Sequence, residues 1–391
     1  MRLATISALA WAFLLIESAL ADTEANPSAC KLPAIQDVYL SSGFGGDYDS
    51  APSLGKMTGF MIFVDFIDGV AGEATESLRD IFIPKGPDWF STASFGKLNH
   101  QITTDTSKFF RMPNDTESYG FTRGLTWEAH NRYIQDALQA YEEKCKKLKP
   151  VDILYVVATK NASAISFSPT FMGPVTTRSG VKVAKKAVTI GYDAYVKWFS
   201  KVMNHESGHA MGLADYYPFS GGETGMYVGG WSLMGYINGA SPDYFAWDKW
   251  RLGWLQDEQV DCVSEAGKTT HTLSPMDTPD GNSPIKAVVI KKNETSALIA
   301  EVRSSNGNNV GSCAKGVLLY TVATNVATGT GPVVVLDSSP DSIGCDGTAF
   351  GNAPLALDGS GARSYTSSEF GVTIEVVEQE GEEYRIEIEV V

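Results

Sequence analysis

The stretch HESGHAMGLADYY, residues 205–217, constrains the fold of this chain more than any other. The residues before it, 195–204, carry apolar and polar side chains at about helical spacing, so we expect His205 and His209 to lie on one face of a helix. Two imidazoles on one face, with the carboxylate of Glu206 between them, form the arrangement that a catalytic zinc ion requires. Glu206 would then accept the proton of a water that zinc makes more acidic.

The continuation of the motif predicts how the helix ends and offers a third ligand. Gly212 comes where the helix should stop, because glycine adopts a left-handed conformation at little steric cost. Asp215 follows three residues later, and the spacing HExxHxxGxxD resembles the extended zinc signature of the metzincin metallopeptidases. The resemblance implies that Asp215 is the third ligand, while a residue that caps or braces the loop is the structural alternative.

A second motif, WSLMGY at residues 231–236, resembles the methionine turn that lies beneath the zinc in metzincins. Met234 would supply a soft apolar floor under the ligands. Tyr236 stands where several metzincins keep a tyrosine whose hydroxyl approaches the metal or the tetrahedral intermediate. The resemblance therefore implies a catalytic role for Tyr236 in stabilising an oxyanion, and an ordinary core tyrosine is the alternative.

Together with WDKWRLGW at residues 247–254 and MIFVDFID upstream, these motifs look like the immune inhibitor A family of secreted metallopeptidases, over most of the chain. Two departures concern the third ligand. Ala214 stands where family members usually have proline, and Glu223 resembles an acidic residue that some members carry in a glycine-rich loop. Glu223 is therefore the alternative third ligand, and Asp215 is favoured on spacing.

The amino terminus reads as a secretory signal peptide, residues 1–21. Arg2 precedes an apolar run at 3–16, and the A-x-A pattern predicts cleavage after Ala21. That run is short for a bilayer, and no later segment approaches the length of a transmembrane helix. We therefore expect a secreted, extracellular protein without a membrane span.

Length and charge limit the domain organisation and the partners. About 370 residues follow the leader, more than one hydrophobic core usually serves, so two domains are expected. The formal net charge of −15 argues against nucleic acid and anionic membranes as partners. Solubility outside the cell explains such a charge, and we expect a monomer.

Five cysteines follow the leader, in a compartment where disulfides persist, and an odd number leaves at least one unpaired. Cys313 with Cys345 is the preferred pair, because both lie in the carboxy-terminal region. Cys30 with Cys145 is a second suggestion. As an alternative, Cys30 could bind the zinc in a latent form of the protein.

Patterning divides the rest of the chain. Residues 22–56, rich in Ser, Gly and Asp, read as a linker or short activation segment, in which Asp47 or Asp49 could block the site. Residues 57–257 form the catalytic domain, with buried strands from residue 57 and at 152–159, a hairpin or strand pair at 95–110, a helix at 127–147 and an edge strand at 181–192. Residues 258–391 show short β-branched runs between turns, which predicts an all-β, sandwich-like domain.

Several smaller features have structural alternatives. Asn114, Asn161 and Asn293 begin glycosylation sequons, which predicts a glycoprotein if the secretory route is eukaryotic. Acidic clusters at 277–282 and 337–346 offer oxygen ligands for Ca²⁺, but neither has EF-hand spacing, and ordinary turn chemistry is the alternative. The dispersed His100, His130 and His271 are expected to be surface or satisfied structural residues.

The sequence thus predicts an α+β fold: a metzincin-like catalytic domain with a twisted sheet, an active-site helix and a Met-turn, followed by an all-β domain. The expected function is a secreted zinc metalloendopeptidase that hydrolyses extracellular proteins, with Glu206 as general base. Protein or peptide substrates would bind in extended form along an edge strand. The alternatives are a secreted glycan- or protein-binding module with a structural zinc, and a zinc hydrolase for a small substrate.

Overall fold

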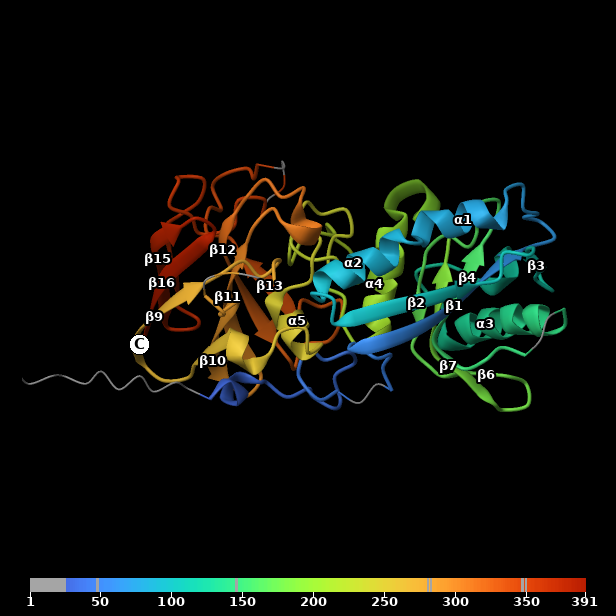
Figure 1. Cartoon of the computed structure of the whole chain (residues 1–391), viewed down its shortest axis with the longest axis horizontal. Coiled ribbons are helices and arrows are strands. Elements are labelled where there is room, and N and C mark those ends of the chain that lie inside the picture. The colour runs from blue at the N-terminus through green and yellow to red at the C-terminus, as the bar shows by residue number, and fades with distance from the viewer. Residues whose placement is uncertain are drawn as a thin grey trace, which may run out of the picture.

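The computed structural model describes residues 26–46, 49–144, 147–279, 281, 283–345, 348 and 350–391. The predicted signal peptide and Asp47 lie outside the described residues. The described chain has a mixed α+β fold with several sheets and few helices. Figure 1 shows a half built on one sheet with helices, at the right, and a half dominated by strands, at the left. No helix among the described residues is long and apolar enough to cross a membrane.

The first half is organised around a seven-stranded sheet with the strand order β2-β1-β4-β7-β5. Its parallel strands are β1 (Gly55–Asp65), β2 (Leu98–Thr104), β3 (Phe110–Arg111), β4 (Val151–Ala158) and β7 (Lys182–Ile190). The short strands β5 (Thr170–Phe171) and β6 (Val175–Thr176) both pair antiparallel with β7.

Two expectations for this sheet are wrong. Residues 95–110 do not form a hairpin or strand pair, because β2 and β3 each pair in parallel with β1 instead of with each other. The strand predicted at 181–192 does not lie at the edge, because the chain returns after β4 and adds β5 and β6 along its outer side. Alternation within β7 could not predict this insertion.

Alternating residues of the central strands face two cores. Met61 and Phe63 of β1 belong to one apolar cluster, whereas Ile62 and Val64 belong to another. The first face is covered by α1 (Thr75–Phe82), α2 (Lys85–Ala93) and α4 (Ser200–Ala210), and the second by α3 (Trp127–Glu142). In Figure 1 these helices lie on opposite sides of the sheet. Thr126 caps α3 by accepting from the backbone N–H of Ala129, and the helix ends earlier than residue 147.

The second half consists of two stacked sheets. The five-stranded sheet has the order β13-β12-β11-β10-β8, and the four-stranded sheet has the order β14-β15-β16-β9. Apolar side chains of both sheets share one cluster, the arrangement of a β-sandwich. The strands are β8 (Val260–Val263), β9 (Gly267–Leu273), β10 (Ala287–Asn293), β11 (Ser296–Arg303), β12 (Gly316–Ala323), β13 (Val333–Leu336), β14 (Ser364–Ser367), β15 (Val372–Glu380) and β16 (Glu383–Val390).

Short helices connect these parts of the chain. The α-helix α5 (Ala246–Arg251) precedes the sandwich. A single π-helical turn, η3 (Ala194–Trp198), leads into α4. The remaining turns are 3₁₀-helical: η1 (Pro27–Cys30), η2 (Glu117–Tyr119), η4 (Asp257–Gln259) and η5 (Gly307–Asn309).

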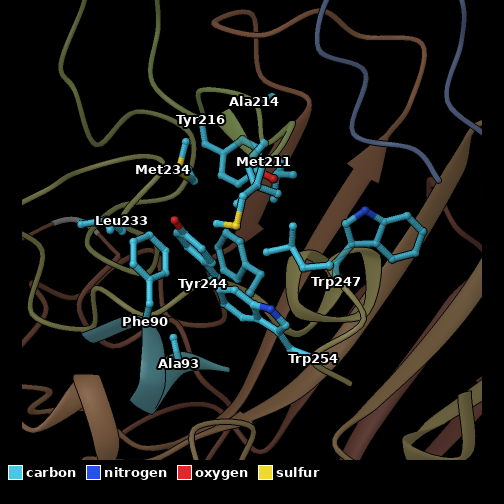
Figure 2. Packing of buried hydrophobic residues seen from close by; sticks show 14 of the residues in the cluster. Phe90, Ala93, Met211, Ala214, Tyr216, Leu233, Met234, Tyr244, Trp247 and Trp254 are labelled. Carbon is cyan, nitrogen blue, oxygen red and sulfur yellow. The ribbon is translucent and has the colours of Figure 1, made fainter. Parts of the chain in front are cut away.

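The two halves share the largest apolar cluster, which runs from α2 and the sheet to residues of β10 to β13. Figure 2 shows its centre, where Tyr244 and Trp254 lie between Phe90 and Trp247. The rings of Tyr244 and Trp254 stack with centroids 5.6 Å apart. A boundary at residues 257 and 258 therefore falls within a continuous core.

The described part of residues 22–56 is not a linker. Cys30 forms a disulfide with Cys262, and the indole of Trp247 donates to the backbone oxygen of Ser42. Asp49 pairs with Lys182 on β7 and not with the predicted metal ligands. This segment is therefore packed against both halves of the molecule, even though its composition is typical of a loop.

The disulfides decide between the cysteine pairings. Cys313 pairs with Cys345, which confirms that prediction. The pairing of Cys30 with Cys145 is wrong, because Cys30 pairs with Cys262 across 232 positions of sequence. In this structure Cys30 has no thiol to offer a metal, so the latent alternative is wrong as well. Cys145 lies outside the described residues.

Candidate metal centre

The helix α4 carries the central motif and ends as predicted. Residues 202–210 are all buried, and His205 and His209 lie on the same side of the helix. Gly212 has a φ of 97°, a value that residues other than glycine rarely adopt. The backbone N–H of Leu213 donates to the oxygen of Gly208 at 3.0 Å, which closes the turn. The chain thereby returns toward the histidines and brings Asp215 with it.

Three ligand atoms converge at this place. Nε2 of His205 and Nε2 of His209 are 3.2 Å apart, and each lies 3.1 Å from Oδ1 of Asp215. Two ligands of a tetrahedral zinc, with bonds of ~2.0–2.1 Å, stand about 3.3 Å apart, so these separations fit such an ion. Oδ1 of Asp215 is buried, and no hydrogen bond of regular geometry reaches it from the described residues. The donor set of two imidazoles and one carboxylate is one that zinc accepts.

Backbone carbonyls orient both imidazoles. Nδ1 of His205 lies 2.8 Å from the oxygen of Leu233, and Nδ1 of His209 lies 2.8 Å from the oxygen of Leu213. A carbonyl can only accept, so each Nδ1 carries the proton, and the Nε2 of a neutral ring keeps its lone pair toward Asp215. This is the usual way in which proteins orient histidine ligands.

The electrostatics of the pocket favour a cation. Burial raises the pKa of Asp215, but the close interactions with His209 and His205 outweigh burial and hold that pKa well below its usual range. Burial likewise lowers the pKa of His209, but Asp215 and Glu206 outweigh it and raise that pKa to about 9. The carboxylates therefore stabilise positive charge between the imidazoles, whether a proton or a metal ion supplies it.

Glu206 lies beside this centre, and one of its two carboxylate oxygens accepts a hydrogen bond from a neighbouring side chain. Its Oε1 is 3.9 Å from Nε2 of His205, and its Oε2 accepts from the hydroxyl of Thr170 at 2.7 Å. Burial is the largest cause that raises the pKa of Glu206, although the two histidines and Thr170 act against it. A carboxylate with a raised pKa, held by one oxygen, is suited to exchange a proton through the other.

The floor of the centre is the turn that contains Met234. A Cβ added to Gly208 would lie 2.7 Å from Sδ of Met234 and 2.6 Å from the hydroxyl of Tyr244. The oxygen of Met234 accepts from the backbone N–H of Tyr216 at 2.8 Å. In Figure 2 Met234 and Tyr216 lie near each other at the top of the buried cluster. The turn thus packs against α4, and the absence of a side chain at Gly208 permits the close approach.

The carboxy-terminal half helps to position Asp215. Its backbone N–H donates to the hydroxyl of Thr328 at 2.8 Å, and its carbonyl accepts from the N–H of Gly329 at 3.1 Å. Both residues lie in the connection between β12 and β13. The β-rich half therefore contributes directly to the position of Asp215 in the candidate metal centre.

Two other predicted site residues are more exposed. Glu223 is exposed. Tyr236 is 37% exposed. A different tyrosine, Tyr217, has its ring centroid 6.2 Å from that of His205. Burial and the charges of Asp215 and Glu206 raise the pKa of Tyr217, so its hydroxyl keeps its proton and can donate.

A cleft of about 630 Å³ opens beside the centre. Its lining includes Thr170, which holds Glu206, and Tyr217, together with Arg123, Trp127 and Phe171. Sequence reasoning missed Thr170 and Arg123, because neither belongs to a motif. Tyr217 lies within the HESGHAMGLADYY stretch, and its place two residues after Asp215 was the signal for it.

The other histidines have structural partners. Nε2 of His100 lies 3.1 Å from the hydroxyl oxygen of Tyr155, and burial lowers the pKa of His100 to about 3. His130 lies 2.9 Å from the hydroxyl of Thr189, and His271 lies 2.6 Å from Asp261.

The carboxylate of Asp277, the first residue of one predicted calcium cluster, is buried and accepts from Ser304 and Asn309. Asp280, Asn282 and Asp346 of the two clusters lie outside the described residues. The three sequon asparagines are exposed.

Comparisons with known proteins found no match: no family model matches the chain, and no curated protein matches it. The resemblance to immune inhibitor A rests on the motif residues of the chain itself.

Proposed function

We propose that this protein is a secreted zinc-dependent metalloendopeptidase with a metzincin-like catalytic domain. In this proposal His205, His209 and Asp215 hold one Zn²⁺, and Glu206 acts as the general base. The observation that carries the proposal is the convergence of two Nε2 atoms and one buried carboxylate oxygen within 3.1–3.2 Å of one another, with a fourth group, Glu206, beside them. The two disulfides agree with an oxidising compartment.

Each residue of the candidate site has a separate role in the proposed hydrolysis. When bound, the zinc ion supplies a Lewis acid and lowers the pKa of water. Glu206 accepts the proton of the attacking water and returns it to the leaving amine. Thr170 fixes one oxygen of Glu206, which leaves the other free to exchange that proton. Tyr217 and Tyr236 are the candidate donors to the oxyanion, and burial of Tyr217 beside His205 favours the former.

An extended peptide is the substrate form that the sheet favours. β5 is the last strand in the sheet order, and it contains Thr170. We infer that a peptide pairs with β5 through main-chain hydrogen bonds, which give affinity with little dependence on side chains. A peptide bound there would pass close to Glu206, because Thr170 contacts both the backbone oxygen and the carboxylate of Glu206.

The decisive experiment is hydrolysis of unfolded casein by protein lacking residues 1–21. We expect activity that a zinc chelator removes and that Glu206→Gln abolishes while zinc content is retained. Inactivity of the zinc-loaded protein, also after limited proteolysis, would favour a binding module with a structural zinc.

A further inference from the structure

The cleft beside the metal centre differs in charge from the rest of the molecule. The chain carries a formal net charge of −15, yet none of the described residues that line the cleft is acidic. One guanidinium, Arg123, is in the lining. The described residues provide no ion pair for Arg123, so its charge faces the cleft without a carboxylate to neutralise it.

Arg123 lies beside aromatic residues of the cleft. Its guanidinium is 6.0 Å from the ring centroid of Phe167, and its charge acts on Tyr217, which lines the same cleft. Tyr217 in turn neighbours His205. A guanidinium has five N–H donors, which are suited to a ligand in the cleft. Arg123 therefore lies next to the candidate metal centre while it remains exposed to solvent.

An aromatic wall lies in the same cleft. The rings of Trp127 and Phe171 have centroids 4.2 Å apart, and Trp127 is 52% exposed. A Cβ at Gly173 would lie 2.3 Å from the Trp127 ring, so the indole rests against the backbone there. An indole with one supported face and one exposed face can bury a large apolar side chain of a ligand.

We propose that this cleft makes the enzyme prefer peptides that place a large apolar side chain against Trp127, whose ring packs on buried Phe171, and a carboxylate against Arg123. The inference rests on the proposed peptidase function and names the substrate class of the same site. Guanidinium and carboxylate match in charge and in planar geometry, and none of the described residues that line the cleft supplies a competing carboxylate. The carboxylate comes either from a Glu or Asp side chain or from the carboxy terminus of the peptide.

The test measures binding of fluorescent peptides to the Glu206→Gln protein by fluorescence polarisation. In the first series one Phe stands among Ala residues, and Glu is one to three positions from it on either side, with an amidated terminus. The second series has Gln in place of Glu, and the third has Gln and a free terminal carboxylate. A fourth series replaces Phe by Ala.

We expect at least one Glu or free-carboxylate register to bind ~3- to 10-fold tighter than its matched Gln amide. Arg123→Gln should remove this difference. Arg132→Gln is the matched control, because Arg132 is an exposed arginine of α3 that bonds to the Ser118 carbonyl and does not line the cleft. It should retain the difference. Peptides of the fourth series, which have Ala in place of Phe, should bind more weakly than their Phe counterparts.

Equal binding of all matched peptides, no binding of any peptide, or a preference that persists in Arg123→Gln would each overturn the inference. Hydrolysis of the same peptides by protein with intact Glu206 separates the two proposals. Cleavage of all matched peptides at equal rates would retain the peptidase and reject the preference. Selective binding without cleavage by zinc-loaded protein would retain the cleft and reject the peptidase.

Discussion

Gly208 offers a test of the contact between α4, which carries the proposed metal ligands, and the turn that contains Met234. Replacement of a helical glycine by alanine usually stabilises a helix by about 1 kcal/mol. At Gly208 the added Cβ would lie 2.6 Å from the hydroxyl of Tyr244 and 2.7 Å from Sδ of Met234, and real Cβ contacts are essentially never below 3.0 Å. The two effects have opposite signs, so the measured sign identifies the stronger one.

Neither contacting atom can retreat easily. The ring of Tyr244 is fully buried and stacks on Trp254, and its hydroxyl donates to the oxygen of Asn204 at 3.1 Å. Met234 is fully buried, and its carbonyl is bonded to Tyr216. Overpacking of such a site costs about 1–3 kcal/mol, so we expect Gly208→Ala to destabilise the protein by about 1 kcal/mol net.

The same substitution should weaken metal binding. Movement of the turn would displace the oxygen of Leu233, which lies 2.8 Å from Nδ1 of His205. Loss of a partner that orients a ligating histidine typically costs ~10- to 100-fold in metal affinity. We therefore expect a weaker zinc affinity of that order in the Gly208→Ala protein.

The assays are urea unfolding of the chelator-treated protein and a competitive zinc titration. Gly72→Ala is the control, because a Cβ there meets nothing nearer than the amide nitrogen of Asn161 at 3.5 Å. A Gly208→Ala protein that is about 1 kcal/mol more stable, with unchanged zinc affinity, would refute the tight contact between helix and turn.

Three further predictions use other parts of the molecule. Asp215→Asn should lose zinc while Glu223→Gln keeps it, as measured by metal content after dialysis, and the opposite result would make Glu223 the ligand. Because burial lowers the pKa of His100 to about 3 from 6.5, the neutral ring stabilises the fold above pH 6.5, and this stability is lost as pH falls toward 3. His100→Gln should therefore lose about 2 kcal/mol less than the parent between pH 7 and pH 5 in urea unfolding, and equal losses would show that the ring titrates normally. Replacing Cys30 and Cys262 together by serine should cost about 5 kcal/mol by the loop-entropy model, because the bridge spans 232 positions, and a loss below about 1 kcal/mol would contradict that model.

The helix α4 that carries His205 and His209 could be predicted from sequence because its determinants are local. The spacing of His205 and His209, and Gly212 where the helix ends, act within a few residues of one another. The apolar runs that became β1 and β4 are likewise local patterns, and each is buried on both faces.

Contacts between distant segments escaped sequence reasoning. Thr170 bonds to Glu206, 36 positions away, and no motif surrounds it. Cys30 found Cys262 and not Cys145, because η1 packs beside β8 and β10. The edge strand β5 was missed since two residues are too few to show an alternating pattern.

The sequence by itself determined the chemistry that is available at the centre: two imidazoles on one helical face, a carboxylate between them and a glycine that turns the chain back. Only the tertiary structure decided that Asp215 meets both imidazoles, because its backbone is held by Thr328 and Gly329 from the β-rich half. Only the tertiary structure, too, brought Arg123, Trp127 and Tyr217 into one cleft. Side-chain spacing along a helix follows from its fixed period, whereas the meeting of separate segments depends on the packing of the whole chain.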